Sequence, residues 1–232
     1  MKKNIKKIFI EKLPVFYKSI LNKILNIPKK ECVYFDTKTI SDGHHKITYR
    51  NIPMIRCPFD YVMYQIIINE IKPDLIIEIG TNFGGTTLYL ADIMDKLEHG
   101  TIHSIDIVRK TTKVTEQHPR IKLFMDGWEK YDITQTNKFS KILVIEDGSH
   151  MYESSLGALN KFSPIVSIGS YYIVEDGIIN ELGLKREYHG GPIRAINDFL
   201  KTNNNFIIDK TYCDMFGKNA TFNVMGYLKK TK

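Results

Sequence analysis

The chain has 232 residues, 43% of them hydrophobic, which is enough for one sizeable globular domain and an appendage. Its three cysteines are far apart and it lacks the long uncharged apolar run of a membrane-spanning helix, which excludes a disulfide framework, a cysteine zinc site and an integral membrane protein and indicates the cytoplasm. The net charge of +7 is concentrated in residues 1–30, where nine lysines against one glutamate give +8 and leave −1 for the remaining residues. A nearly neutral body argues against a nucleic-acid partner.

Residues 1–30 predict a basic amphipathic helix that is broken or kinked at Pro14. Apolar residues recur there at steps of three or four between the lysines. Two interpretations stay open. The helix binds an anionic membrane surface, which would place the protein peripherally at the inner membrane face, or it packs on the body or on a second subunit of a homo-oligomer. We assign residues 1–50 to this arm and an irregular lead-in, and residues 51–232 to the main domain.

Residues 59–71 predict a helix, and residues 74–91 then predict a strand, a glycine turn and a helix that runs to about Leu97. This is the nucleoside-binding corner of a Rossmann-like sheet, in which glycines let a ligand lie against the backbone. The spacing E-x-G-x-x-x-G differs from the G-x-G-x-x-G of NAD enzymes, and the acid before the first glycine suits S-adenosylmethionine, whose amino-acid end is cationic. An ordinary βα turn is the alternative. The predicted cofactor residues are Glu78, Gly80, Thr81, Asn82, Gly84, Gly85 and Thr86.

The next two predicted strands also end in acids. Residues 101–106 end in Asp106, which lies at the distance along the chain where a carboxylate accepts hydrogen bonds from the ribose hydroxyls of a bound nucleoside. Residues 121–126 end in Asp126, which we expect near the adenine amino group, with Trp128 packed beside it. Acids at strand ends are common. The prediction that Asp106 binds the ribose therefore rests on its occurring together with the glycine corner.

Residues 141–147 and 170–176 predict two further strands, separated by a helix over residues 152–162. A helix follows from Gly191 through Leu200, and residues 206–212 and 222–228 alternate as two last strands. Strand and helix repeated, closing with an antiparallel hairpin, is the layout of a Rossmann-like class I methyltransferase. The sequence therefore predicts an α/β fold with a mostly parallel seven-stranded sheet.

Titratable side chains follow the fourth and fifth strands. One strand ends in Asp147, with His150 three residues later, and the other ends in Glu175 and Asp176. The carboxyl ends of parallel strands meet at one edge, where three carboxylates would repel one another unless a cation neutralises them. Oxygen ligands without cysteine favour Mg²⁺, and His150 would stand beside it as a proton acceptor. A solvated turn and a hydrogen-bonded histidine are the alternatives.

These motifs resemble the cephalosporin hydroxylase family, which includes rhamnosyl and macrolide-sugar O-methyltransferases. The resemblance covers residues 50–228 and rests on Glu78-Ile-Gly-Thr, on Glu146-Asp-Gly-Ser-His and on Val174-Glu-Asp. It implies a methyltransferase fold in which Asp147, Glu175 and Asp176 bind Mg²⁺ and His150 is the base; Asp147 is counted in the cofactor site as well. Residues 178–190 match no pattern, and we expect them to shape the acceptor pocket.

The resemblance implies an O-methyltransferase that uses S-adenosylmethionine and Mg²⁺ on a sugar hydroxyl of a surface glycan or glycosylated metabolite. Three alternatives stay open. One is methylation of an aromatic diol of the catechol type, which would also chelate the metal. Another is a non-catalytic cofactor-binding partner of a hydroxylase. The third, an NAD-dependent oxidoreductase, is disfavoured by the glycine spacing.

Overall fold

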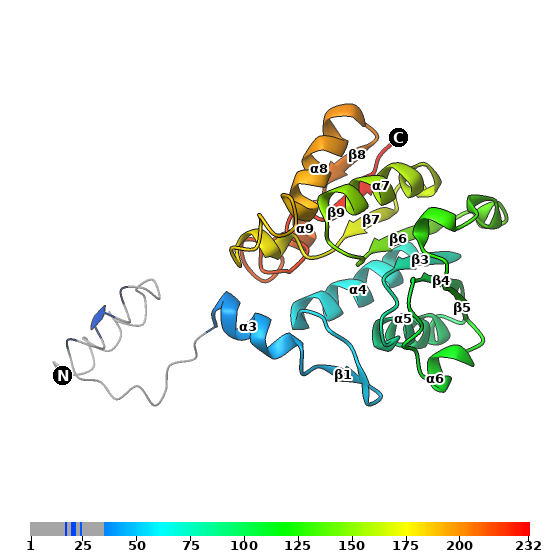
Figure 1. Cartoon of the computed structure of the whole chain (residues 1–232), viewed down its shortest axis with the longest axis horizontal. Helices are drawn as coiled ribbons and strands as arrows, with labels where there is room; N and C mark the ends of the chain where they lie inside the picture. Colours follow the sequence, from blue (N-terminus) through cyan, green and yellow to red (C-terminus); the bar gives the residue numbers. More distant parts are fainter. Residues whose placement is uncertain (1–16, 18–19, 22–23, 25–34) are drawn as a thin grey trace, which may run out of the picture. The chain divides into compact units, whose positions relative to one another are not determined.

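The computed structural model describes residues 35–232 and, before them, residues 17, 20, 21 and 24 (Figure 1). The chain divides into two compact units, Met1–Asp36 and Thr37–Lys232. The amphipathic helix predicted for residues 1–30 lies outside the described residues except at those four positions. The division into an arm and a main domain at residue 50 stays a prediction.

A seven-stranded sheet forms the centre of the second unit, with the strand order β5-β4-β3-β6-β7-β9-β8. Neighbouring strands from β5 to β7 are parallel, whereas β9 runs antiparallel to both β7 and β8. The strand bounds are β3 Leu75–Ile79, β4 Thr101–Ile105, β5 Ile121–Phe124, β6 Ile142–Glu146, β7 Tyr171–Val174, β8 Phe206–Ile208 and β9 Tyr227–Lys230. This arrangement confirms the predicted class I methyltransferase fold.

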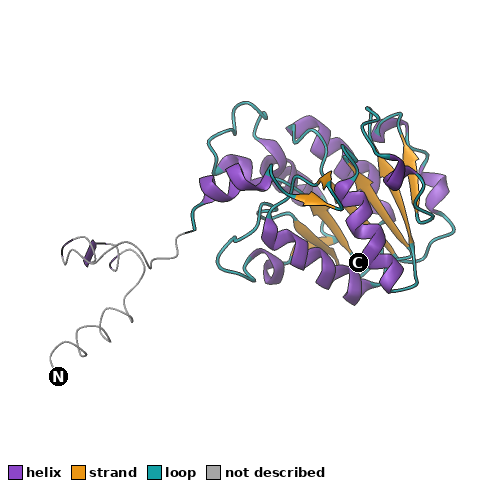
Figure 2. Ribbon diagram, turned by 90° about the horizontal axis from the view of Figure 1, so that it is seen from below, coloured by secondary structure: helices purple, strands orange, loops and turns teal. Residues whose placement is uncertain are grey.

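Helices cover both faces of the sheet (Figure 2). The α-helices are α3 Thr37–His44, α4 Pro58–Ile71, α5 Gly85–Lys96, α6 Lys113–Glu116, α7 Tyr152–Phe162, α8 Gly191–Thr202 and α9 Lys210–Cys213. The 3₁₀ turns are η2 Trp128–Lys130, η3 Ile133–Thr136, η4 Ser163–Ile165 and η5 Gly177–Asn180, and a two-stranded hairpin pairs β1 Thr48–Tyr49 with β2 Ile52–Pro53. Among the described residues, no helix is long and apolar enough to cross a membrane.

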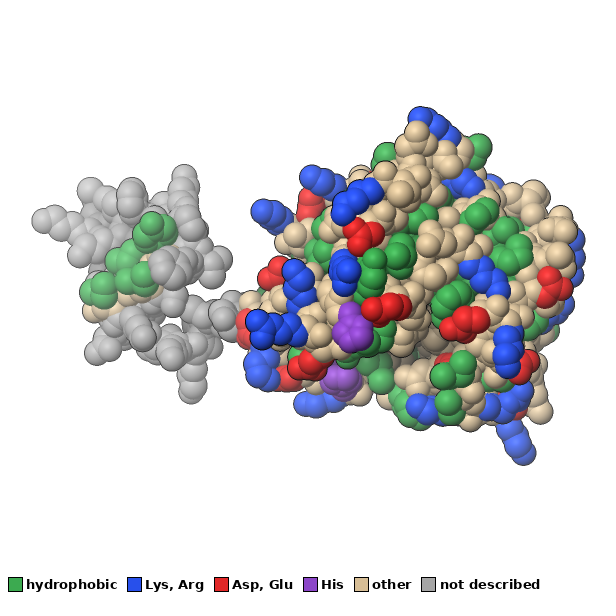
Figure 3. Space-filling view, turned by 45° about the horizontal axis from the view of Figure 1, so that its top comes forward, with side chains coloured by type: hydrophobic (Ala, Val, Ile, Leu, Met, Phe, Trp, Pro, Cys, Tyr) green, Lys and Arg blue, Asp and Glu red, His purple; other side chains and the backbone are tan. Residues whose placement is uncertain are grey.

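The central strands are continuous apolar runs in the sequence because they lie between two hydrophobic cores. Every residue of β3 and β6 is buried. Alternate side chains point to opposite faces, so that Leu75 and Ile77 pack with α7 and α8, whereas Ile76 and Leu143 pack with α4 and α5. The outer surface carries interspersed acidic and basic side chains on the face seen in Figure 3, as the nearly neutral charge of residues 31–232 predicts.

The last two strands pair antiparallel at the sheet edge as predicted, but they are shorter than the ranges 206–212 and 222–228. The first ends at Ile208 because the Asp209 carboxylate accepts the Thr211 N–H (2.9 Å) and starts α9. Residues 222–226 are irregular because buried Asp60 accepts the N–H of Phe222 (3.1 Å). The lead-in is also more ordered than predicted, since it contains α3 and the β1–β2 hairpin.

Candidate active site

A cavity of about 740 Å³ opens at the carboxyl ends of the parallel strands. Its wall is built by the segments that follow the strands, namely residues 79–83, 85–86, 105–108, 110, 127–129 and 147–150, with Asp176 and Ile179 after β7. Residues 53–55, the end of α3 and side chains between Leu182 and Tyr188 complete it. An open parallel sheet binds ligands at this edge, and the cavity has the size of a small-molecule site.

The glycine corner packs closely against neighbouring backbone. Gly80 has a φ of +103°, and a Cβ there would lie 1.9 Å from the Asp147 carbonyl oxygen. A Cβ on Gly85 would lie 2.3 Å from the carbonyl oxygen of Pro53, and one on Gly84 would meet the Thr115 side chain. Glycine is therefore required here by the approach of two chain segments, a reason that the sequence pattern does not reveal. Gly80 and Gly85 line the cavity, whereas Gly84 does not.

Glu78 lies beneath the corner, fully buried and outside the cavity wall. Its Oε2 accepts hydrogen bonds from Thr87 (2.5 Å) and Ser104 (2.6 Å), while its Oε1 has no partner among the described residues. Burial, opposed by these two hydrogen bonds, raises the pKa of Glu78 to about 7. The side chain links the start of α5 to β4 and so fixes the shape of the corner.

Asp106 lies in the cavity wall, held by three backbone donors. Its carboxylate accepts the N–H groups of Asn82 (2.7 Å), Ile107 (2.7 Å) and Val108 (3.1 Å). These hydrogen bonds fix the orientation of the carboxylate beside the glycine corner. Thr81, Asn82 and Thr86 line the cavity around it.

Asp126 does not join these residues. It is exposed and lies outside the cavity wall, because β5 ends at Phe124 and the chain turns at Gly127, with a φ of +82°. Gly127 and Trp128 line the cavity in its place. The structure thus brings together the predicted corner and Asp106, but not Asp126.

Asp147, His150 and Asp176 form one cluster in the wall of the cavity. His150 Nε2 lies 3.2 Å from Asp176 Oδ2 and 3.9 Å from Asp147 Oδ1, and one ligand atom from each residue lies within 4.8 Å of the others. His150 and Asp176 both have a φ of +57°, a left-handed conformation that is uncommon outside glycine and that often marks a functional site.

Glu175 lies next to this cluster and is held by two neighbours. Its Oε1 accepts an ion-paired hydrogen bond from Arg56 Nη1 and a hydrogen bond from the Tyr64 hydroxyl (2.7 Å). Arg56 also donates from Nη2 to Asp147 Oδ2 (3.2 Å). Sequence reasoning missed Arg56 and Tyr64, and the only available signal was an arginine between apolar residues just before a helix.

The electrostatics of the cluster favour a bound cation. Burial raises the pKa of Asp147, as does the neighbouring Glu175 carboxylate, whereas Arg56 opposes the shift. Burial likewise raises the pKa of Glu146. His150 Nδ1 is buried with no hydrogen-bond partner among the described residues. The carboxylate oxygens of Asp147 and Asp176 are the hard ligands that Mg²⁺ prefers, so the donor set fits this ion.

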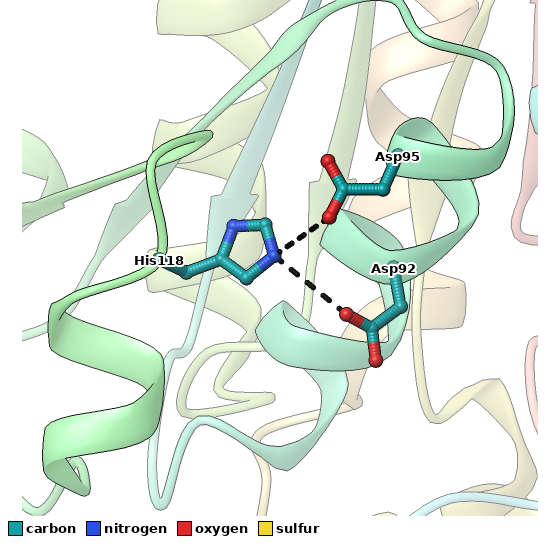
Figure 4. A group of neighbouring side chains, drawn as sticks. All are labelled: Asp92, Asp95 and His118. Carbon is teal, nitrogen blue, oxygen red and sulfur yellow. Dashed lines mark hydrogen bonds and ion pairs between the residues drawn. The ribbon is translucent and has the colours of Figure 1, made fainter.

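A second cluster, formed by Asp92, Asp95 and His118, has a different character (Figure 4). His118 Nε2 lies 3.1 Å from Asp95 Oδ2, and its Nδ1 accepts the Arg120 N–H (3.3 Å), which leaves the ring proton on Nε2. That proton occupies the atom that would have to bind a metal. Arg120 already pairs with Asp95, and Arg50 pairs with Asp92. We assign this cluster to an ion-pair network that connects α5 with the segments around it.

Known proteins resemble this chain in sequence and in fold. A family model described as Rhamnosyl O-methyltransferase/CmcI matches residues 42–231. The Rhamnosyl O-methyltransferase of Mycobacterium leprae is 27% identical over 185 residues, which cover 72% of this chain and 80% of that protein. The solved structure of cmcI-N160 with SAH superposes with a TM-score of 0.63 at 16% identity and covers 91% of this chain and 92% of that one.

A cmcI structure with Mg-SAM gives a TM-score of 0.61 at 17% identity and covers 91% of this chain and 84% of that one. These likenesses confirm the predicted fold and the predicted enzyme class, an S-adenosylmethionine-dependent O-methyltransferase. The family match spans most of the chain. The protein therefore belongs to the Rhamnosyl O-methyltransferase/CmcI family.

Proposed function

We propose that the protein methylates a sugar hydroxyl, with S-adenosylmethionine at the glycine corner and Mg²⁺ at the carboxylate cluster. The observation that carries this proposal is that one cavity joins the two sites. Asp106 and residues 79–83 and 85–86, here called the cofactor end, line this cavity together with Asp147, His150 and Asp176, here called the carboxylate end. A methyl donor and an acceptor hydroxyl held in the same cavity have the proximity that a methyl transfer needs.

The cofactor end would hold the nucleoside. The Asp106 carboxylate is fixed by three backbone N–H groups, two on Oδ1 and one on Oδ2, and Oδ2 can still accept a hydrogen bond from a ribose hydroxyl. Trp128 and Ile107 line the same end and offer apolar surface to a purine. Bound S-adenosylmethionine supplies an electrophilic methyl group on a positively charged sulfur.

The carboxylate end would activate the acceptor. Asp147 and Asp176 are the residues that we propose to hold Mg²⁺, which supplies positive charge that favours an ionised hydroxyl. His150 would accept the hydroxyl proton. After that transfer its imidazolium would lie beside Asp176 Oδ2 and Asp147 Oδ1, whose negative charges stabilise it. Arg56 and Tyr64 both occupy Glu175 Oε1, so Glu175 would join the metal through its Oε2.

A sugar acceptor is supported by the relative from Mycobacterium leprae and by a further part of the cavity wall. That wall offers His44, His45, Leu182, Leu184 and Tyr188. Ring and aliphatic faces pack against the C–H faces of a sugar, and imidazole nitrogens hydrogen-bond to its hydroxyls. A catechol-type diol is the second candidate, because it would chelate the same metal.

An acceptor screen separates these candidates. The full chain, S-adenosylmethionine and Mg²⁺ would be incubated with deoxysugar conjugates and with catechols, and methyl transfer measured by mass spectrometry. We expect methylated sugar, no methylated catechol, and loss of product when Mg²⁺ is chelated. Transfer only to the catechols would refute the sugar assignment. Stabilisation by NADH instead of S-adenosylmethionine in a thermal shift assay would refute the cofactor assignment.

Replacing Asp106 with alanine should weaken S-adenosylmethionine binding by roughly 10- to 100-fold, as expected for loss of charge-assisted hydrogen bonds worth about 1.5–3 kcal/mol. Isothermal titration calorimetry measures the change. Asp126→Ala is the matched control, since this exposed acid lies outside the cavity, and it should bind the cofactor like the wild type. If Asp106→Ala also binds normally, the carboxylate only caps its own loop.

Deleting residues 1–30 should leave cofactor binding intact, because every described residue of the cavity wall lies at position 41 or later. We propose that this lysine-rich arm binds anionic membrane surfaces. The full chain should then co-sediment with anionic vesicles and be released as salt rises, whereas the shortened chain should stay in the supernatant. If neither chain sediments with the vesicles and the deletion lowers the number of subunits per particle, the arm joins subunits instead.

A further inference from the structure

Arg56 bridges two carboxylates of the site that come from different strands. The residue is only 2% exposed. Its Nη1 pairs with Glu175, which follows β7, and its Nη2 donates to Asp147, which follows β6 (3.2 Å). Among the described residues, it is the one arginine or lysine paired with either carboxylate.

Two features of Arg56 are unfavourable in themselves. It lies two residues before Pro58, which starts α4, where the helix dipole is positive and disfavours a cation. Its Nε is buried with no partner among the described residues, which also costs stability. A residue that breaks local rules in this way is expected to serve the site. The ion pairs with Asp147 and Glu175 offset the cost of burying the Arg56 cation.

The charges of the cluster show what Arg56 does there. Asp147, Glu175 and Asp176 carry −3 together when ionised, and Arg56 reduces this to −2, which a divalent cation would neutralise. We infer that Arg56 is the built-in counter-ion of the metal site and sets its affinity for Mg²⁺. This inference rests on the metal site of the proposed function. Arg56 is a positioning residue, since it acts through Asp147 and Glu175.

Two consequences follow from this role. The guanidinium holds the Oδ2 atom of Asp147, which leaves Oδ1 facing His150 and the cavity. It also repels any cation bound nearby, so the wild type should bind Mg²⁺ more weakly than the same carboxylates would without it. A purely structural ion pair would have the first effect alone and would leave Mg²⁺ affinity unchanged.

The test compares the full-length wild type with Arg56→Met. Titration calorimetry measures MgCl₂ binding, and thermal melts are recorded with and without saturating MgCl₂. We expect Arg56→Met to bind Mg²⁺ on the order of tenfold more tightly, because a unit charge a few ångström from a divalent ion is repulsive even in a polar site. It should melt well below the wild type without Mg²⁺ and recover much of that loss with it. If it is unfolded alone, Mg²⁺ should restore a cooperative transition.

Two further variants complete the design. Arg56→Met/Glu175→Gln removes both charges of the pair, so the cluster has the wild-type net charge again and Mg²⁺ affinity should return to within about threefold of wild type. Arg120→Met removes the partner of Asp95 in the second cluster. Its loss of melting temperature should be the same with and without Mg²⁺, and its Mg²⁺ affinity should be that of the wild type.

The outcomes distinguish this inference from the proposed function. Equal Mg²⁺ affinity in wild type and Arg56→Met, or an equal loss of melting temperature with and without Mg²⁺, would overturn the counter-ion role and leave the metal site standing. Binding by Arg56→Met but not by the wild type would support the counter-ion role and remove Mg²⁺ from the proposed function. Binding by neither would overturn both.

Discussion

Replacing His150 with alanine should reduce turnover by roughly 10²–10⁴-fold at neutral pH, the usual scale for one general base. S-adenosylmethionine and Mg²⁺ should still bind, because His150 belongs to neither the glycine corner nor the pair of carboxylate ligands. The loss should shrink as pH rises, because the acceptor hydroxyl then ionises without help. Steady-state rates across pH, with binding of cofactor and metal measured separately, test this result.

The backbone of His150 calls for a second variant. Its φ of +57° is tolerated by asparagine better than by alanine, so His150→Asn removes the base with less strain. Both variants should lose turnover alike. His189→Asn is the matched control, since His189 is an exposed histidine, also with a positive φ, that pairs with Glu153 and lies outside the cavity wall. A near-normal rate in His150→Asn, or loss of metal binding, would show that His150 is not the base.

Asp147→Asn and Glu175→Gln should fail in different ways, although both acids follow neighbouring strands. Asp147→Asn keeps the shape of the side chain but removes a charged ligand, so Mg²⁺ should bind at least about tenfold more weakly and turnover should fall with it. Calorimetry with MgCl₂ and rates at several Mg²⁺ concentrations measure both effects. The melting temperature without Mg²⁺ should change little, because Arg56 keeps its pairing with Glu175.

Glu175→Gln should mainly destabilise the fold, since it removes one of the two carboxylates that pair with the buried Arg56 cation. Breaking such a pair costs about 3–5 kcal/mol, or a fall in melting temperature on the order of 10 °C for a domain of this size. Mg²⁺ should still bind to the folded protein, but on the order of tenfold more weakly, because one nearby negative charge is lost. If Glu175→Gln instead keeps its stability and loses Mg²⁺ binding altogether, then Glu175 is itself a metal ligand.

The sheet and the strand-end acids were predictable because buried parallel strands are short, apolar and bounded by turns. The helix predicted over residues 152–162 has the bounds of α7, and Asp106, Asp147 and Asp176 all lie in the cavity wall. The periodicity of a strand reports which residues are buried, and the topology of a parallel sheet then places the strand ends together.

The direction of individual side chains was harder to predict. Glu175 and Asp176 are adjacent in sequence, yet one turns to Arg56 and the other to His150. That choice depends on a partner 119 residues earlier in the chain, which no local pattern reveals. Asp126 fell outside the cavity because its strand ends two residues early. The helix start at Asp209 was also missed, because the predicted strand ran through it to residue 212, although aspartate is a preferred N-cap residue.

The position of β9 has a consequence for the order in which the active site can be completed. Because β9 inserts between β7 and β8, the strand that carries Glu175 and Asp176 has an unpaired edge until residues 227–230 have left the ribosome. The Val174 N–H donates to the carbonyl of Gly226, just before β9 (2.9 Å). This late segment of the chain therefore also fixes the backbone just before the two acids. During synthesis, a nascent chain whose proposed cofactor residues have all left the exit tunnel would still present an open sheet edge, which favours aggregation.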